Sequence, residues 1–178
     1  MAFRQVDERV AYAGDFVTVV QAGYVTEGGE RFEREFLRHV GAVAMVPVVE
    51  DRRVALDRQF RAAVGRDLLE IPAGLLDVDG EDRELAAVRE LAEEVGRRPV
   101  DALEELVEYL PMAGMADHRV WIYLARRTVA CPVEPHGIEE QHMTIEHVDL
   151  DDVDELIASG EISDGKTIIG LLLARARL

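Results

Sequence analysis

The pattern of apolar and polar residues predicts mainly β-strands in the first part of the chain. The segment 41–49 is continuously apolar, which is typical of a strand that is buried on both faces. In the next segment Val54, Leu56 and Phe60 alternate with polar residues, as in a strand with one inner face. The predicted strands span residues 17–20, 32–40, 41–49, 53–60 and 68–71.

A helix is predicted directly after these strands. Its apolar positions recur at three- and four-residue intervals and form one face of the helix. Asp82 is a suitable N-cap, and Gly96 ends the pattern. The expected apolar face consists of Leu85, Val88, Leu91, Ala92 and Val95.

The rest of the chain predicts three further strands and two helices. A short helix with an acidic start is expected, followed by a last helix whose Arg175 and Arg177 suit its negative end. Strands on both sides of a central helix, with a closing helix, indicate an α+β protein built as an α/β/α sandwich. The strands span residues 103–109, 119–125 and 143–148, and the helices span 151–159 and 167–178.

Composition indicates an ordinary globular protein. The 178 residues suit one domain, and 48% hydrophobic and 31% charged residues are usual values. No apolar run reaches the ~18 residues of a membrane span, and residues 1–5 have no hydrophobic signal core. Because Cys131 is the only cysteine, no intrachain disulfide is expected, and a cytoplasmic location is predicted.

The formal net charge of −16 argues against a nucleic-acid partner, which would require basic surface. An anionic small-molecule substrate would need cations beside it. Most of the acidic residues are expected to serve solubility alone. A functional interpretation applies only where they cluster at ligand spacing.

Glu90, Glu93 and Glu94 form such a cluster on the predicted helix, because residues three and four apart lie on one side of a helix. Like charges at this spacing destabilise a helix, and the C-terminal half of a helix disfavours anions. A hard divalent cation such as Mg²⁺ would remove the conflict. The alternative is a solvated acidic face without a ligand.

The segment from Gly74 to Gly96 resembles the Nudix box, the signature of the Nudix hydrolase family. Gly74, Glu81 and the run from Arg89 to Gly96 carry the resemblance. The family has five residues between the first Gly and Glu, whereas this chain has six. The family also has an aliphatic residue after the last Gly, where this chain has Arg97.

The resemblance implies a Nudix fold with a mixed central sheet and a role for each motif residue. An N-terminal antiparallel strand region (1–40) would precede the hydrolase domain (41–178). Mg²⁺, with Mn²⁺ as a substitute, would be bound by carboxylates, assisted by Glu93 and by the backbone carbonyl of Ala73. Arg89 would form ion pairs within the motif and hold the carboxylates in place. Glu90 and Glu94 would be the main ligands, and Glu81 would orient the loop–helix–loop or contact a metal through water.

Two segments resemble the ADP-ribose pyrophosphatase branch of this family: 58–61 and 69–75. By that resemblance Arg58 and Arg61 would bind the diphosphate of a nucleotide sugar, and Glu70 would contact the ligand or preorganise the site. Surface charge is the alternative for both arginines. The enzyme would cut ADP-ribose, or a related ADP-sugar, to AMP and a sugar phosphate.

The segment 137–143 resembles the loop that supplies a catalytic glutamate in that branch. Glu139 aligns with this glutamate and Glu140 is the close alternative; the competing interpretation is a plain acidic loop. One departure concerns the substrate, since Ala113 stands where the branch has a proline and His118 replaces an acid.

The sequence is therefore compatible with three functions. They are an ADP-sugar diphosphatase, a Nudix hydrolase of another nucleotide sugar or of a dinucleoside polyphosphate, and a catalytically silent domain that binds a nucleotide metabolite. The resemblance also implies a homodimer through the N-terminal strands. No membrane partner is expected, because no apolar run is long enough to span a bilayer.

Overall fold

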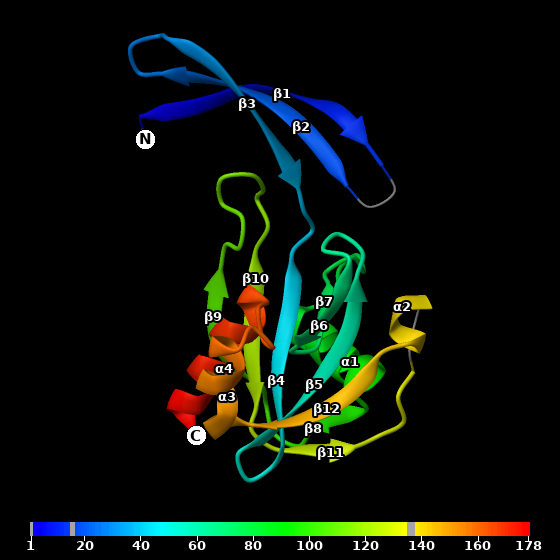
Figure 1. Cartoon of the computed structure of the whole chain (residues 1–178). Coiled ribbons are helices and arrows are strands. Elements are labelled where there is room, and N and C mark those ends of the chain that lie inside the picture. Colours follow the sequence, from blue (N-terminus) through cyan, green and yellow to red (C-terminus); the bar gives the residue numbers. More distant parts are fainter. Residues whose placement is uncertain (1, 15–16, 135–137) are drawn as a thin grey trace. The chain divides into compact units, whose positions relative to one another are not determined.

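The computed structural model describes residues 2–14, 17–134 and 138–178. The residues up to Gly41, together with Leu110–Arg119, form one unit, and Ala42–Tyr109 with Val120–Leu178 form a second. Figure 1 shows the elements of both units. Among the described residues, no helix is both long and apolar enough to cross a bilayer.

The first unit contains an antiparallel sheet in the order β1-β2-β3. The segment 110–119 joins this unit because the backbone of Leu37 pairs with Ala116. Asp117 also accepts hydrogen bonds from the backbone N–H of His39 (2.8 Å) and from the Arg38 guanidinium (2.6 Å). The strands are β1 (Phe3–Ala13), β2 (Thr18–Thr26) and β3 (Arg31–Arg38).

A mixed sheet organises the second unit, with the order β12-β5-β4-β10-β9. Strands β4 and β10 are parallel, whereas β5 pairs with β4, β6 and β12 in antiparallel fashion. Strand β7 pairs with β4, and β8 pairs with β11 in a separate ribbon. The strands are β4 (Ala42–Glu50), β5 (Arg53–Arg61), β6 (Arg66–Glu70), β7 (Ala73–Leu75), β8 (Arg97–Pro99), β9 (Glu104–Tyr109), β10 (Val120–Ala125), β11 (Thr128–Ala130) and β12 (Thr144–Asp149).

Helices cover both faces of this sheet (Figure 1). Helices α3 (Val153–Ala158) and α4 (Gly165–Arg177) pack on one face, and α1 (Arg83–Val95) packs on the other. A short 3-10 helix, η1 (Leu150–Asp152), precedes α3, and α2 (Ile138–Gln141) precedes β12. The predicted α+β sandwich with a mixed sheet is confirmed.

Strand β4 contributes to both cores, as its continuous apolar sequence predicts. Ala44 and Val46 belong to the core under α4, whereas Val43 and Met45 belong to the core under α1. All four side chains are fully buried. Alternation along a strand sends neighbouring side chains to opposite faces, so only a strand covered on both sides can be apolar throughout.

The prediction that Phe60 and Leu85 face the core is wrong. Phe60 is 47% exposed, because it lies opposite Asp67 near the hairpin end of β5, beyond the residues that join either core. Leu85 is 63% exposed. Helix α1 is rotated so that two alanines and a glutamate face inward with Leu91 and Val95; the buried set is Ala86, Ala87, Leu91, Glu94 and Val95.

Candidate active site

Helix α1 begins and ends at the predicted residues. The Asp82 side chain accepts a hydrogen bond from the backbone N–H of Glu84 at 2.8 Å, which caps the helix. Gly96 ends it in the left-handed conformation, with φ of 59°, where a side chain would be strained. These caps fix where the helix begins and ends, and therefore which residues it contains.

Arg89 connects the carboxylates of the motif. Its guanidinium donates to both oxygens of Glu81, at 3.1 and 3.0 Å, and to one oxygen each of Glu90 (2.6 Å) and Glu93 (3.1 Å). A planar guanidinium holds several carboxylates in fixed directions. Three of the predicted ligands are therefore gathered around one cation.

Gly74 lies against the Glu90 side chain. A Cβ built on Gly74 would be 1.9 Å from Glu90 Cδ, well inside contact distance, so any larger residue at this position would force the Glu90 carboxyl group to move. Beside it, the backbone N–H of Ala73 donates to Glu94 Oε2 at 2.8 Å. The β7 strand thus contacts two carboxylates of α1 through its backbone.

The two inward carboxylates are energetically unfavourable as anions. Burial, followed by the charges of Asp57 and Glu90, raises the pKa of Glu94 well above its usual range. Burial also raises the pKa of Glu90, although Arg89 opposes the shift. The concentration of buried negative charge would be relieved by a bound cation.

Asp57 is a buried acid that the sequence analysis did not single out. Burial and then the charge of Glu70 raise its pKa to about 7, while Lys166 and Arg61 act in the opposite direction. Asp57 follows Leu56 in an alternating strand, so its sequence position indicates a solvent-facing residue. Asp57 is buried because both faces of β5 are covered, and the alternation of apolar and polar residues along the strand does not predict this.

Glu70 is the buried centre of a partly buried ion-pair network. Its Oε2 atom accepts from Arg61 Nη2 at 2.6 Å and from Lys166 Nζ at 2.6 Å. Arg58, the other arginine predicted to bind substrate, does not join this network. It forms ion pairs with Glu146 (2.5 Å) and Glu161 instead. The structure therefore brings Arg61 and Glu70 together and separates Arg58 from them.

The predicted catalytic loop is described from Ile138 onward, and Gly137 lies outside the described residues. Glu139 and Glu140 belong to the short helix α2. The negative charge of Glu140 contributes to the raised pKa of both Glu90 and Glu94. This electrostatic interaction indicates that Glu140 of α2 lies near the carboxylates of α1.

The donor chemistry fits a hard divalent cation. In the described ranges, no three Asp, Glu, His or Cys side chains converge as a ready-made metal cage. Glu90 and Glu94 nevertheless supply buried carboxylate oxygens with raised pKa, and Gly74 leaves room for the Glu90 carboxylate. Oxygen ligands of this type, completed by water and phosphate, are those that Mg²⁺ takes.

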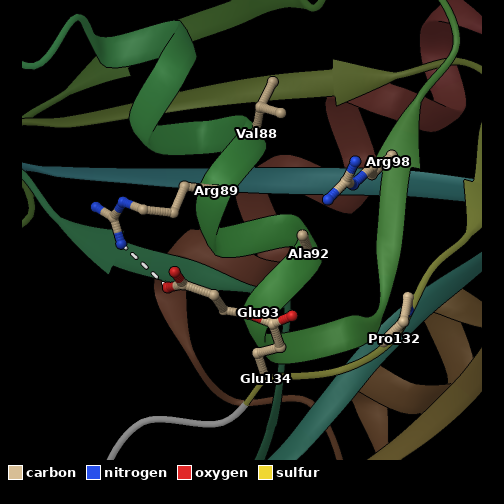
Figure 2. Close-up of a pocket in the computed structure, with 7 residues that line it drawn as sticks. All are labelled: Val88, Arg89, Ala92, Glu93, Arg98, Pro132 and Glu134. Atoms are coloured by element: carbon tan, nitrogen blue, oxygen red, sulfur yellow. Dashed lines mark hydrogen bonds and ion pairs between the residues drawn. The ribbon is translucent and has the colours of Figure 1, made fainter.

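A cavity of about 260 Å³ borders the outer side of α1. Figure 2 shows Arg89 and Glu93 joined by an ion pair on the helix, with Arg98 on the neighbouring strand β8. The cavity is smaller than a typical small-molecule site, so it can hold only part of a nucleotide. The lining residues are Val88, Arg89, Ala92, Glu93, Arg98, Pro132 and Glu134.

Comparison with known proteins identifies the family to which the chain belongs. The NUDIX domain model matches residues 38–169, which include the complete glycine, arginine and carboxylate arrangement described above. The chain belongs to the Nudix family. It is a Nudix hydrolase with similarity to ADP-ribose pyrophosphatases.

Two curated relatives and one solved structure illustrate this Nudix relationship. The ADP-ribose pyrophosphatase of Mycobacterium tuberculosis (strain ATCC 25618 / H37Rv) is 34% identical over 98% of this chain and 84% of its own length. The CMP-5'-(N-acetyl-N-hydroxy-3-aminopropyl)phosphonate hydrolase of Streptomyces rubellomurinus (strain ATCC 31215) is 38% identical over 93% of this chain and 78% of its own. An ADP compounds hydrolase shares the fold, with a TM-score of 0.86, 23% identity, and coverage of 100% of this chain and 95% of that one.

Proposed function

We propose that this Nudix hydrolase cuts the diphosphate bond of ADP-ribose or a related ADP-sugar, giving AMP and a sugar phosphate. The observation that carries the proposal is the gathering of Glu81, Glu90 and Glu93 around Arg89, beside the buried Glu94. The relative named ADP-ribose pyrophosphatase, which aligns over 98% of the chain, supports the substrate.

Mg²⁺ is the proposed cofactor, with Mn²⁺ as a substitute. Glu90 and Glu94 would be the main ligands, with Glu81, Glu93 and the backbone carbonyl of Ala73 assisting. When bound, such a cation neutralises the diphosphate and makes a water molecule easier to deprotonate. Arg89 holds the carboxylates in place before the cation binds, which lowers the cost of assembling the site.

Glu140 is the favoured residue for positioning or deprotonating the attacking water, with Glu139 as the alternative. Both belong to α2, but only Glu140 is half-buried and acts on the pKa of Glu90 and Glu94. A general base must lie near the reacting water. This requirement favours Glu140, whose charge interacts with Glu90 and Glu94.

Arg61 is the favoured diphosphate ligand, because a guanidinium binds phosphate oxygens in bidentate fashion. Glu70 would position Arg61 through the ion pair between them, at 2.6 Å. Arg58 was also predicted to bind substrate. Arg58 is the weaker candidate, because it pairs with Glu146 and Glu161, whereas the charge of Arg61 interacts with Asp57 and Glu94.

The acting form is proposed to be a cytoplasmic homodimer that pairs through its N-terminal strands. Exposed apolar side chains on β1 support this interface, among them Phe3, Val10 and Tyr12. The molecular mass in solution, measured by light scattering, tests the assembly. A monomeric mass contradicts it without affecting the proposed reaction.

A second candidate is a Nudix hydrolase of another nucleotide conjugate. The relative with 38% identity is named as a hydrolase of a CMP-linked phosphonate, so the base and the leaving group both remain to be tested. A catalytically silent binding domain is disfavoured because Glu90, Glu93 and Glu94 are all present.

A substrate panel distinguishes these functions. The protein is incubated with Mg²⁺ and ADP-ribose, other ADP-sugars, GDP-sugars, CMP conjugates and dinucleoside polyphosphates, and the products are separated by chromatography. Release of AMP and ribose 5-phosphate from ADP-ribose supports the proposal. Turnover of other compounds alone supports the second candidate, and binding without turnover supports the silent domain.

A further inference from the structure

Lys166 is the only lysine of the chain, since every other one of the 20 Lys and Arg residues is an arginine. It lies in the first turn of α4, directly after Asp164 and Gly165, and its side chain is only 13% exposed. A chain that uses arginine at all its other Lys or Arg positions has its one lysine in a partly buried position, next to Glu70.

The Lys166 ammonium bridges two carboxylates. Nζ lies 2.6 Å from Glu70 Oε2 and 3.0 Å from Asp164 Oδ2. A compact ammonium can direct its three N–H groups to acceptors in different directions, whereas an arginine fork demands acceptors in one plane. Arginine is therefore a poor replacement at this position.

Glu70 receives two cations on the same oxygen atom. Arg61 Nη2 and Lys166 Nζ are each 2.6 Å from Glu70 Oε2, and the Glu70 side chain is 2% exposed. A buried carboxylate that loses its partner is strongly destabilised. If Arg61 were the only cation, Arg61 would be held by Glu70 and would be less free to turn toward another anion.

The start of α4 is also hydrogen-bonded to the segment between β6 and β7, just before the strand that contacts Glu94. Thr167 Oγ1 donates to Asp164 Oδ2 at 2.7 Å and accepts from the backbone N–H of Ile71 at 3.0 Å. Ile71 lies between Glu70 and the Pro72–Ala73 pair, and the N–H of Ala73 donates to Glu94. Lys166 and Thr167 thus hold Glu70 and Ile71, the residues that lead through Pro72 to the Ala73 contact with Glu94.

We propose that Lys166 is a positioning residue that keeps Glu70 neutralised, so that Arg61 can be shared between Glu70 and the diphosphate of the substrate. This inference rests on the proposed function for its kinetic consequence. The contact between Lys166 and Glu70 itself is testable without a substrate.

Steady-state kinetics of Lys166→Met provide the first test. With ADP-ribose, KM is expected to rise about tenfold with a smaller change in kcat, because loss of a binding contact acts on ground and transition states alike. Arg175→Met is the matched control, since it removes an ion pair, with Asp154 at 3.0 Å, from the other end of the same helix. It is expected to leave KM unchanged.

Two further variants separate electrostatics from packing. Lys166→Arg retains the charge and is expected to recover only part of the lost affinity. Adding Glu70→Gln to Lys166→Met removes the carboxylate that needs neutralising, so the double variant is expected to bind better than the sum of the two single effects predicts. Equal kinetics of Lys166→Met and Arg175→Met, or simple additivity of the double variant, overturns the inference.

Amine acylation tests the contact in the absence of turnover, and also if Lys166→Met does not fold. An N-hydroxysuccinimide ester can modify one ε-amine in this chain, and peptide mass spectrometry reads its rate directly. Glu70→Gln is expected to accelerate modification of Lys166 several-fold, whereas Asp154→Asn is not. An unchanged rate in Glu70→Gln overturns the inference. A wild-type protein inert to the whole substrate panel overturns the proposed function and the kinetic consequence drawn from it, but not the neutralisation of Glu70 by Lys166.

Discussion

Asp57 of β5 and Glu70 of β6 lie directly opposite each other in an antiparallel strand pair, and each residue is only 2% exposed. Like charges at opposed positions destabilise a sheet, and burial increases the cost. Arg61 and Lys166 offset it by pairing with Glu70. The fold therefore maintains a buried acid pair beside the α1 carboxylates at an expense in stability, as functional sites commonly do.

Glu94→Gln is expected to lower kcat by roughly 100-fold or more, because it removes a charged metal ligand from the site. The thermal midpoint without metal should stay the same or rise, since burial and the charges of Asp57 and Glu90 disfavour the Glu94 anion. Activity assays and calorimetry measure the two effects. Near-normal turnover would refute the assignment of Glu94 as a ligand.

Gly74→Ala is expected to reduce activity by roughly tenfold or more, because a misplaced catalytic group is costly and the new Cβ would overlap the Glu90 carboxyl group. Gly114→Ala is the matched control, because no atom lies within 4 Å of a Cβ built there. Both variants are compared by kinetics and circular dichroism. Equal activity would mean that Glu90 can move aside without consequence.

Chelation with EDTA is expected to abolish turnover, and added Mg²⁺ or Mn²⁺ should restore it. A ligand that binds only the folded state at 100 times its Kd adds ~2.7 kcal/mol of stability, so Mg²⁺ should raise the thermal midpoint of the wild-type protein. Glu94→Gln should show a smaller rise. Full activity after exhaustive dialysis against chelator contradicts a metal requirement.

Acid should destabilise the first unit through His118. Its ring stacks on His39 with centroids 3.7 Å apart, and burial, followed by the charge of His39, lowers the pKa of His118 to about 4. The unfolded chain has a His pKa of about 6.5, so between these values the unfolded state binds more protons, and stability falls as the pH falls through this window.

The measurement compares thermal midpoints at pH 7.5 and pH 5 for the wild-type protein and His118→Phe. The variant should lose less stability on acidification, because phenylalanine keeps the stacked ring but cannot bind a proton. Carboxylates that titrate in the same range affect both proteins and cancel in the comparison. An identical acid response in the two proteins contradicts the prediction.

The local pattern predicted much of the framework. Asp82, Gly96 and the continuous apolar run 41–49 have the structural roles that their residue types favour, because capping and two-sided burial depend mainly on neighbouring residues. The orientation of α1 was not predictable in this way. Leu85 is exposed and Glu94 is buried, since the helix turns its carboxylate toward β7.

The sequence by itself determined the family, the capped helix and the spacing of Glu90, Glu93 and Glu94, because these features are encoded within one contiguous segment. Only the tertiary structure decided which distant residues share the site. Asp57, Glu70 and Lys166 lie far apart in sequence and meet through strand register and the docking of α4. Such long-range proximity depends on how the cores pack, which no local pattern of side chains specifies.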